Sequence, residues 1–415
     1  MNLLMLTKQY PYGTGEAFVE NEIGVISGYY DNILIIACEV PRVKKGVRPL
    51  PHNVTACAIP AESKGKNALL GAVRLFSNEQ NFSAEKKHCE TMPQRLFLGY
   101  FEEKAQAIYK KINERCLLKE ITNQPYALYS YWLFTTARVG TLIAEKKKPR
   151  YMFTRAHRYD LYEDRNPTNY LPYRRFFLET FDGVFPCSNN GTAYLKSRYQ
   201  DCSENVMTSL LGTLDHGLGK KSTDGVYRIV SCSRVEPVKR VQQIVNALSV
   251  IDSENLHIEW THIGDGSEFD KIKGLASKKL KTVKTVFRGN MKNSDIMELY
   301  ASCPFDLFVN VSSSEGLPVS IMEAISFGIP CVATDVGGTS EIVIDGVTGQ
   351  LIPSDFTAED LSSILSDFVH GQKYIDRTSC REYWLRNFQA IPNYQRLYDF
   401  LRIHKNSSIA GDINE

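Results

Sequence analysis

The sequence predicts an α/β protein built on two parallel sheets. Short apolar runs such as Asn32–Ala37 alternate with longer amphipathic stretches, which is the pattern of repeated strand–helix units. The pattern restarts near residue 226, after a glycine-rich segment. With 415 residues, 43% hydrophobic and 23% charged, the chain is long enough for two domains of ordinary globular composition. We therefore expect domains at 1–210 and 226–380, a linker at 211–225, and a C-terminal helix and tail at 381–415.

Each expected strand is a short apolar run of the length that a buried parallel strand has. In the first half these runs are Asn2–Thr7, Asn32–Ala37, Tyr126–Tyr129, Tyr151–Arg155 and Gly183–Cys187. In the second half they are Tyr227–Ser233, His257–Gly264, Val283–Arg288, Leu307–Val311 and Pro330–Thr334. The intervening periodicity predicts helices at Gly15–Tyr29, Glu85–Ile121, Arg240–Ile251, Asp270–Lys281, Asn293–Ser302 and Pro318–Phe327. Aromatic and leucine residues at helical spacing predict one packing helix over Arg381–His404.

A polar loop and an apolar helix follow the expected strand Leu307–Val311. Pro318 stands at the first helical position, where proline is favoured, and the backbone amides of Gly316 and Leu317 lie just before it. Such amides at the carboxyl end of a parallel strand form an anion site.

Two carboxylates flank this helix start. Glu315 lies in the loop, and Glu323 falls away from the apolar stripe of the helix. Carboxylates beside an anion site can accept hydrogen bonds from hydroxyl groups, so a ligand with both phosphate and sugar hydroxyls would fit. On these residues alone, two acids that only favour the helix dipole are the competing interpretation.

The longer segment resembles a known family. Glu315-x7-Glu323, followed by Gly-Ile-Pro-Cys-Val-Ala-Thr and then Asp335-Val-Gly-Gly-Thr-Ser-Glu341, is similar to the donor-site signature of retaining glycosyltransferases of family 4. The resemblance implies the GT-B fold, in which two Rossmann-like domains with parallel sheets face each other and a C-terminal helix packs back toward the first domain. It also implies that Glu315 contacts the hydroxyls of the donor sugar and Glu323 those of the ribose.

The resemblance extends to a pair of cations after the first strand of the second half. Arg234 and Lys239 match an Arg and a Lys that in the family contact the donor diphosphate. Fixed cations there would stabilise the charge that the leaving diphosphate gains as the glycosidic bond breaks. The family often has glycine directly after this Lys, whereas Arg240 stands here. Gly264 and Arg288 resemble family positions beside the nucleotide, although both are also ordinary turn residues.

In the first half the resemblance implies two further segments. Gly13 and Gly15, after the first strand, resemble the glycine loop of GT-B enzymes, whose amides reach the donor phosphates or the acceptor. His157, between two arginines at a strand end, resembles the family's histidine near the transferred sugar. A structural histidine is the alternative for that position.

The function that the resemblance implies is metal-independent transfer of a hexose from a UDP- or GDP-sugar, with no cofactor. The acceptor would be a glycan or a lipid-linked glycan in bacterial cell-surface polysaccharide synthesis. A nucleotide-sugar epimerase or hydrolase of the same fold, and a non-catalytic GT-B partner subunit, are the alternatives.

Two other enzyme classes fit the residues poorly. A dinucleotide fingerprint at Gly13-x-Gly15-x-x-Phe18, with Glu39 as the ribose acid, lacks its third glycine and lies too far from the strand. A metal-dependent glycosyltransferase of the other common fold would carry an Asp-x-Asp pair, which the sequence lacks.

Charge is distributed unevenly along a chain whose formal net charge is only +2. Residues 1–205 hold 28 Lys and Arg against 21 Asp and Glu, whereas the remainder holds 21 against 26. Basic residues cluster at Arg42–Arg48, at Lys64 and Lys66, and at Lys146–Arg150. The near-neutral total argues against a nucleic-acid binder, while the clusters raise the hypothesis that the first domain docks on an anionic membrane. Solvated surface is the alternative.

The expected location is the cytoplasm, at the inner face of the membrane if docking occurs. The first residues, MNLLMLTKQYPYG, lack the basic start and the apolar length of a secretory signal. The sequence contains no run near the ~18 apolar residues that span a bilayer, and no C-x-x-C pair among its 10 cysteines.

Overall fold

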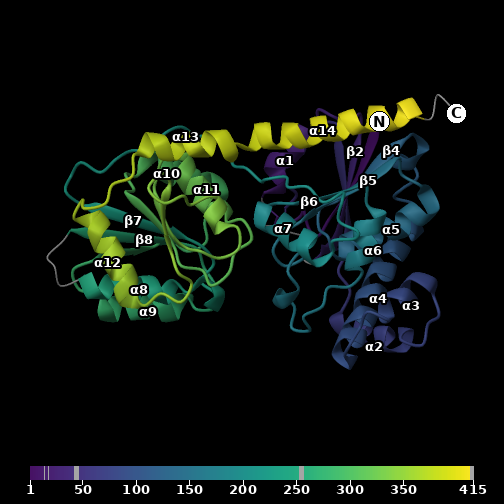
Figure 1. Cartoon of the computed structure of the whole chain (residues 1–415), viewed down its shortest axis with the longest axis horizontal. Helices are drawn as coiled ribbons and strands as arrows, with labels where there is room; N and C mark the ends of the chain where they lie inside the picture. The colour runs from purple at the N-terminus through teal and green to yellow at the C-terminus, as the bar shows by residue number, and fades with distance from the viewer. Residues whose placement is uncertain (14, 17, 42–45, 252–256, 412–415) are drawn as a thin grey trace. The chain divides into compact units, whose positions relative to one another are not determined.

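The computed structural model describes the chain in two compact units. One unit comprises Met1–Ser209 together with the chain from Tyr394 onward, and the other comprises Leu210–Asn393 (Figure 1). We call them the first and second units. The segment 211–225, for which the sequence predicts a linker, is counted with the second unit. The residues that the structure describes are 1–13, 15–16, 18–41, 46–251 and 257–411, with side chains up to residue 402.

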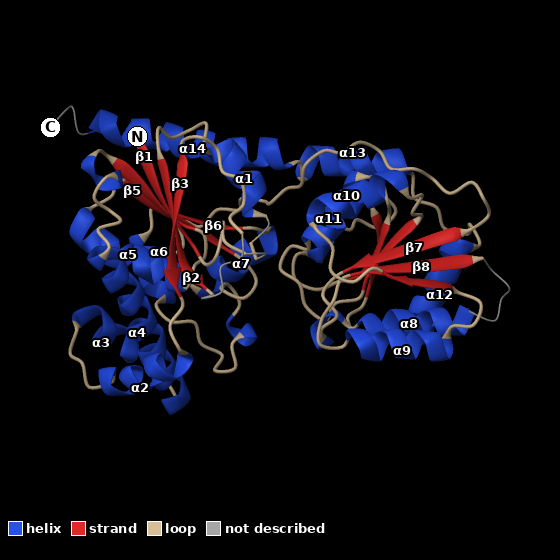
Figure 2. Ribbon diagram, turned by 180° about the vertical axis from the view of Figure 1, so that it is seen from behind, coloured by secondary structure: helices blue, strands red, loops and turns tan. Residues whose placement is uncertain are grey.

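The first unit is a six-stranded parallel sheet with helices on its faces (Figure 2). Its strands are β1 Asn2–Thr7, β2 Ile33–Val40, β3 Val54–Pro60, β4 Tyr126–Ser130, β5 Tyr151–Ala156 and β6 Gly183–Pro186. Its helices are α1 Val19–Ile26, α2 Lys64–Arg74, α3 Gln80–Lys86, α4 Met92–Glu114, α5 Thr135–Lys147, α6 Arg174–Thr180 and α7 Asn189–Arg198. Leu4 at the centre of the sheet pairs with Leu34 of β2 and Leu128 of β4, and all three are buried.

The second unit repeats this architecture. Its strands are β7 Tyr227–Cys232, β8 Ile258–Ile263, β9 Lys284–Phe287, β10 Leu307–Asn310, β11 Cys331–Thr334 and β12 Gly349–Ile352. Its helices are α8 Val241–Ile251, α9 Phe269–Lys279, α10 Asn293–Ser302, α11 Val319–Ser326, α12 Ala358–Val369 and α13 Arg377–Asn387. Helices α8, α9 and α12 lie on one face of the sheet and α10, α11 and α13 on the other (Figures 1 and 2).

Both sheets have the same strand order. The first runs β3-β2-β1-β4-β5-β6, and the second, written from its corresponding edge, runs β9-β8-β7-β10-β11-β12. Every pair of neighbouring strands is parallel. The order reverses between β1 and β4 in the first sheet and between β7 and β10 in the second. Loops diverge at such a switch point, and the crevice at the carboxyl ends of the strands is where open α/β sheets bind ligands. The two parallel α/β sheets that the sequence predicts are confirmed.

Three helical predictions differ in extent from the structure. The predicted helix Glu85–Ile121 is shorter because Thr91 caps α4: its hydroxyl accepts from the Gln94 amide, and the Gln94 side chain accepts from the Thr91 amide. The single helix predicted over Arg381–His404 is two helices, α13 and α14 (Ala390–Gly411). The helix breaks because Phe388 and Ala390 exchange backbone hydrogen bonds with Thr213. The predicted Gly15–Tyr29 contains only the eight residues of α1.

The distal part of α14 is fastened to the first unit by a buried carboxylate. Glu22 of α1 accepts hydrogen bonds from Tyr129 and Tyr131, and from Tyr398 of α14 at 2.5 Å. The guanidinium of Arg155 lies 3.3 Å from the same carboxylate, and both charged side chains are fully buried. Because a buried ion pair needs further hydrogen bonds to offset desolvation, the three phenols stabilise the pair of Glu22 and Arg155 in the core.

Candidate active site

The predicted cations and acids of the second unit follow the two strands on either side of its switch point. Lys239 lies in the loop after β7 and Glu315 in the loop after β10, and their Nζ and Oε1 atoms are 2.5 Å apart. The Asn310 amide, at the end of β10, donates to the same oxygen at 3.4 Å. The side chains are only 17% and 9% exposed, so this ion pair is largely shielded from water. An ammonium and a carboxylate with spare hydrogen-bonding capacity therefore meet at the crevice.

The start of α11 presents free backbone amides beside that pair. The amides of Gly316 and Leu317 have no hydrogen-bond acceptor among the described residues. Pro318, predicted as the first helical residue, is instead the N-cap, with an extended ψ of 102°. A Cβ at Gly337 would stand 2.0 Å from the Glu315 carbonyl oxygen, so glycine there lets the next loop close against this one. The loop before α11 is thus held with its donors unpaired.

Glu323 is buried on α11. It is 9% exposed, and its Oε1 accepts from the Asn293 amide at 2.7 Å. Burial raises the pKa of Glu323 to about 7, and the Asn293 hydrogen bond opposes that rise. The sequence shows that Glu323 leaves the apolar stripe of its helix, and the resemblance implies a contact with the ribose. The structure adds a carboxyl poised between its neutral and ionised forms near neutral pH.

Arg234 is exposed and forms no ion pair with any described residue. The Arg234 loop packs directly against Gly264, which has a φ of 135°. A Cβ at that position would stand 1.9 Å from the Ser233 carbonyl oxygen, so only glycine allows the contact. The Gly264 amide also donates to the Gly289 carbonyl at 2.8 Å, which brings the β8 and β9 turns together. Arg288 stands just before that turn and is exposed, and its amide donates to the His262 carbonyl.

In the first unit, His157 follows β5 and is enclosed by aromatic rings. Its ring lies 4.4 Å from Trp132, 5.2 Å from Tyr131 and 5.7 Å from Phe18, centroid to centroid. Neither ring nitrogen has a hydrogen-bond partner among the described residues. Burial, with a smaller effect of Arg155, holds the pKa of His157 well below its ordinary value. The imidazole is therefore neutral and able to exchange a hydrogen bond with a ligand hydroxyl.

A buried carboxylate positions the main chain at His157. Asp160 accepts from the His157 amide and from the Leu133 amide, both at 2.7 Å. Burial raises the pKa of Asp160 to about 7, and the nearby Arg174 opposes that rise. Asp160 thus joins the ends of β4 and β5. It follows His157 by three residues in the same loop, and that spacing was the only available signal.

The predicted glycine loop is organised by an acid. Gly13 has a φ of 79°, and Gly15 keeps ordinary geometry beside the Gln9 side chain. Glu16, itself at a φ of 57°, accepts from the Lys8 amide at 3.0 Å and from the Tyr10 amide at 2.6 Å. It also accepts from the Trp132 indole and the Gln9 amide. The amides of Lys8, Gln9 and Tyr10, directly after β1, are thus already paired. Residues 14 and 17 of this loop lie outside the described residues.

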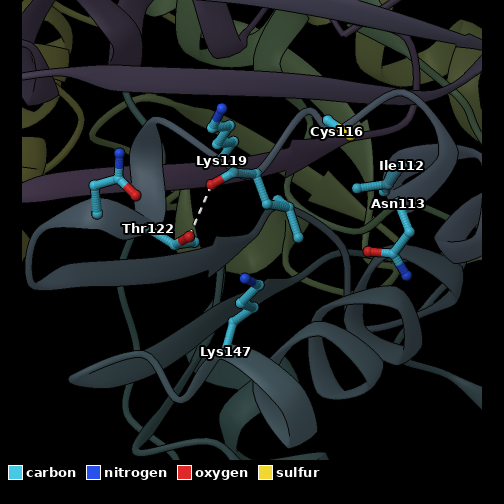
Figure 3. A pocket seen from close by; sticks show the side chains of 8 residues that line it. Ile112, Asn113, Cys116, Lys119, Thr122 and Lys147 are labelled. Carbon is cyan, nitrogen blue, oxygen red and sulfur yellow. Dashed lines mark hydrogen bonds between the residues drawn. The ribbon is translucent and has the colours of Figure 1, made fainter.

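A cavity of about 250 Å³ lies away from these residues, where the β4 and β5 segments begin (Figure 3). It is lined by Ile112, Asn113, Cys116, Leu118, Lys119, Thr122, Asn123 and Lys147. The sequence predicts none of these as a site residue, although Lys147 belongs to the basic cluster Lys146–Arg150. Over the described residues, no group of three His, Cys, Asp or Glu side chains could hold a metal ion. No helix in the described part of the chain is long and apolar enough to cross a bilayer.

Comparison with solved structures identifies the fold of this chain. The chain superposes on the sucrose-phosphate synthase of Thermosynechococcus elongatus with a TM-score of 0.71 and 15% identity, covering 98% of this chain and 100% of that one. Against the lipopolysaccharide outer core galactosyltransferase WaaB, the TM-score is 0.67 at 14% identity, with 97% and 100% coverage. The chain has the GT-B fold. A third GT-B neighbour, Anabaena HepE in complex with UDP and glucose, has a TM-score of 0.66 at 15% identity, covering 97% and 99%.

The family match of this GT-B chain lies in its second unit. Residues 219–384 match the family described as Glycosyl transferases group 1. The N-acetyl-alpha-D-glucosaminyl L-malate synthase of Bacillus anthracis is 30% identical over 186 residues, which are 44% of this chain and 48% of that protein. The lipopolysaccharide 1,6-galactosyltransferase of Escherichia coli K12 is 28% identical over 152 residues, 34% of this chain and 39% of that one. The chain thus spans about half or less of the length of these relatives.

Proposed function

We propose that this protein is a glycosyltransferase that moves a hexose from a nucleoside-diphosphate sugar to a glycan or glycolipid acceptor. We further propose that it belongs to retaining family 4, keeps the anomeric configuration of the sugar and needs no metal ion. The observation that carries the proposal is the Lys239–Glu315 pair, 2.5 Å apart beside the unpaired amides of Gly316 and Leu317. A ligand with a diphosphate at one end and sugar hydroxyls at the other complements that set.

The proposed roles follow the chemistry of each side chain. Arg234 and Lys239 bind the donor diphosphate, and the amides before α11 add neutral donors to the same oxygens. Glu315 accepts hydrogen bonds from hydroxyls of the transferred sugar, and Glu323 accepts from the ribose. Gly264 and Arg288 line the nucleotide side, and Pro318 fixes the start of α11.

The first unit supplies the remaining proposed contacts. The neutral His157 would exchange a hydrogen bond with a hydroxyl of the transferred sugar. Gly13 and Gly15 shape the loop after β1, in which Glu16 accepts from the Lys8 and Tyr10 amides.

The proposed reaction is a same-face substitution at the anomeric carbon. The bond from this carbon to the diphosphate oxygen breaks with its electron pair, and the acceptor hydroxyl forms the new bond on the same face. The acceptor proton passes to the departing phosphate oxygen, so no protein base is required. Arg234 and Lys239 stabilise the charge that the diphosphate gains, which is the step at which fixed cations accelerate such a reaction most.

The test of this proposal is a panel of UDP- and GDP-sugars read by diphosphate release with EDTA present. Release from one donor that persists in EDTA supports metal-independent transfer, and dependence on added Mg²⁺ or Mn²⁺ refutes it. Lys239→Ala and Arg234→Ala should each lower turnover roughly 100-fold or more, by analogy with other electrostatic stabilisers. Lys278→Ala, at an exposed position on α9, is the matched control and should retain wild-type turnover. Near wild-type turnover in both cation variants would overturn the assignment.

The same assay separates the alternatives. Diphosphate release without sugar transfer to any acceptor would indicate a hydrolase, and an altered nucleotide sugar without release would indicate an epimerase. Nucleotide binding with neither reaction would indicate a non-catalytic subunit. The retaining outcome is read from the anomeric configuration of the product by NMR.

We also propose that the first unit contacts an anionic membrane, at its cytoplasmic face. An apolar stripe runs along the outer side of α2 and into the turn that follows it. Leu69 and Val73 of the helix are 71% and 64% exposed, and Phe76, just past its end, is 87% exposed at the same spacing. The opposite side of α2 packs on α4 (Figure 1). Lys64 and Lys66 are exposed on the same helix, and each basic residue near an anionic surface contributes about 1 kcal/mol. Of the predicted basic segment Arg42–Arg48, residues 42–45 lie outside the described residues.

Vesicle sedimentation tests that contact. We expect binding to phosphatidylglycerol vesicles that weakens with salt, no binding to phosphatidylcholine vesicles, and loss of binding in Phe76→Ser. Val250→Ser, at a hydrophobic position that is 45% exposed on α8 of the second unit, is the control and should bind as wild type. Absence from anionic vesicles even at low salt would refute the contact.

A further inference from the structure

Arg240 has a backbone conformation that its residue type disfavours. It directly follows Lys239 and has a φ of 48° and a ψ of 34°, in the left-handed region. A side chain in that region crowds the following carbonyl, so glycine is the favoured residue there. An arginine in this conformation indicates that its side chain makes contacts which offset the steric cost.

Those contacts are three hydrogen bonds to main-chain carbonyls. The guanidinium donates through Nε to the Val311 carbonyl at 2.8 Å and through Nη2 to the Ser312 carbonyl at 3.3 Å. Through Nη1 it donates to the Ser354 carbonyl at 2.7 Å, and it lies 5.0 Å from the centre of the Phe356 ring. It forms no ion pair with any described residue. One side chain thus joins the loop after β7 to the segments that directly follow β10 and β12.

The tether acts on the two loops that carry the candidate active site. Val311 and Ser312 lead directly to Glu315, and Lys239 is the neighbour of Arg240 in the chain. A second link joins the same loops, because the Ser313 amide and hydroxyl both donate to the Val238 carbonyl, at 2.8 and 3.2 Å. The guanidinium adds two hydrogen bonds between the β7 and β10 loops, and a third that ties the β7 loop to the segment after β12.

We propose that Arg240 is a positioning residue that holds the Lys239 ammonium against Glu315 by clamping three carbonyl groups with one planar fork. For its consequence in the reaction, this inference rests on the proposed function. For the placement of Lys239 it rests on the contacts alone. The planar guanidinium is essential, because an ammonium on a flexible stem cannot span three carbonyls of fixed geometry.

Three variants separate the tether from charge and from backbone strain. Arg240→Gly relieves the left-handed strain and removes the tether, so the variant should fold. Arg240→Lys keeps the positive charge but loses the planar guanidinium. If only the charge of Arg240 mattered, this variant would behave as wild type. Arg377→Ala is the matched control, because Arg377 also donates to two carbonyls, those of Phe305 and Phe327, but on the far side of the unit near α13.

The first measurement needs no ligand. The rate at which an amine-reactive acylating reagent modifies Lys239 is followed by peptide mass spectrometry, with the exposed Lys278 as internal standard. We expect Lys239 to react at least threefold faster in Arg240→Gly and in Arg240→Lys, and at the wild-type rate in Arg377→Ala. An unchanged rate in both Arg240 variants, or a full return to the wild-type rate in Arg240→Lys alone, would overturn the inference.

The second measurement is the affinity for UDP and GDP, obtained by calorimetric titration of the full chain. We expect binding at least tenfold weaker in Arg240→Gly and unchanged in Arg377→Ala, with melting temperatures of both variants within about 5 °C of wild type. Equal nucleotide affinity in Arg240→Gly and wild type would overturn the positioning role. If the wild type binds neither nucleotide, the proposed function fails, while the acylation rates still decide whether Arg240 places Lys239.

Discussion

Replacing Glu323 with glutamine removes a titratable group from the interior of the second unit while keeping its shape. Burial raises the pKa of Glu323 from 4.5 to about 7. At 1.36 kcal/mol for each pKa unit, this rise corresponds to roughly 3 kcal/mol of differential stability between the protonated and ionised forms. The folded protein must bear this cost wherever the carboxyl is ionised.

The sign of the pH dependence follows from proton counting. Between pH 4.5 and pH 7 the folded chain holds a proton on Glu323 that the unfolded chain has lost. The contribution of Glu323 to the free energy of unfolding therefore falls as pH rises through this window and levels off above pH 7. Glutamine has no such dependence, and its side-chain oxygen can still accept from Asn293. Glu323→Gln should thus match wild type near pH 4.5 and exceed it by roughly 3 kcal/mol at pH 8.

Thermal unfolding across this pH range measures the effect. A gain of 3 kcal/mol in a unit of this size corresponds to a rise of about 6–12 °C in melting temperature at pH 8. Tryptophan fluorescence follows both units, because Trp260 and Trp384 are buried in the second unit and Trp132 in the first, so a shift confined to one of two transitions assigns the effect. Glu298→Gln, at an exposed position on α10, is the matched control and should show no pH-dependent difference. A pH-independent difference between Glu323→Gln and wild type would refute the reasoning, as would a variant less stable at pH 8.

The same substitution should weaken nucleotide binding under the proposed function. Stability gained together with affinity lost is the expected signature of a residue kept for its function. An unchanged dissociation constant for UDP and GDP would count against the ribose role of Glu323.

Three other perturbations follow from the contacts. Glu22→Ala leaves the guanidinium of Arg155 buried without its counter-charge, so we expect a loss of about 3–5 kcal/mol in chemical denaturation of the first unit; a loss below 1 kcal/mol would contradict it. Gly264→Ala should abolish folded protein on expression, because its Cβ would overlap the Ser233 carbonyl, whereas Gly346→Ala, at a φ of 75° with open space, should cost only about 1 kcal/mol. Equal stability of the two glycine variants would refute the steric argument.

The fold was largely predictable because its central strands are continuous apolar runs. β1 lies at Asn2–Thr7 as expected, since a strand buried on both faces must be apolar throughout. The edge strand β3 was missed because its side chains are partly exposed along most of Val54–Pro60. β12 was missed because Gly349–Ile352 is short and half polar. Edge strands need less apolar surface, so their signal in a sequence is weak.

The site was predictable in composition but not in its contacts. The resemblance singles out Lys239 and Glu315, yet these residues are 76 positions apart, and only the parallel pairing of β7 and β10 brings them together. The hydrogen bond from Asn293 to Glu323 links two helices, and no sequence pattern near either residue predicts it. In the sequence, Arg240 is only a residue that stands where the family often has glycine. Its contacts with the Val311 and Ser354 carbonyls depend on segments that are distant in the sequence.

The anchoring of Tyr398 on Glu22 has a consequence for synthesis on the ribosome. The carboxylate lies in the first helix of the chain, whereas the phenol that completes its shell lies beyond the entire second unit. At ~5–20 residues per second, roughly 10–40 s pass between the emergence of Ser209 and that of Tyr398. During that interval the Glu22–Arg155 pair of the nascent first unit lacks the hydrogen bond from Tyr398. Its core therefore closes only when the C-terminal helix arrives, which makes the first half of the chain the last to be finished.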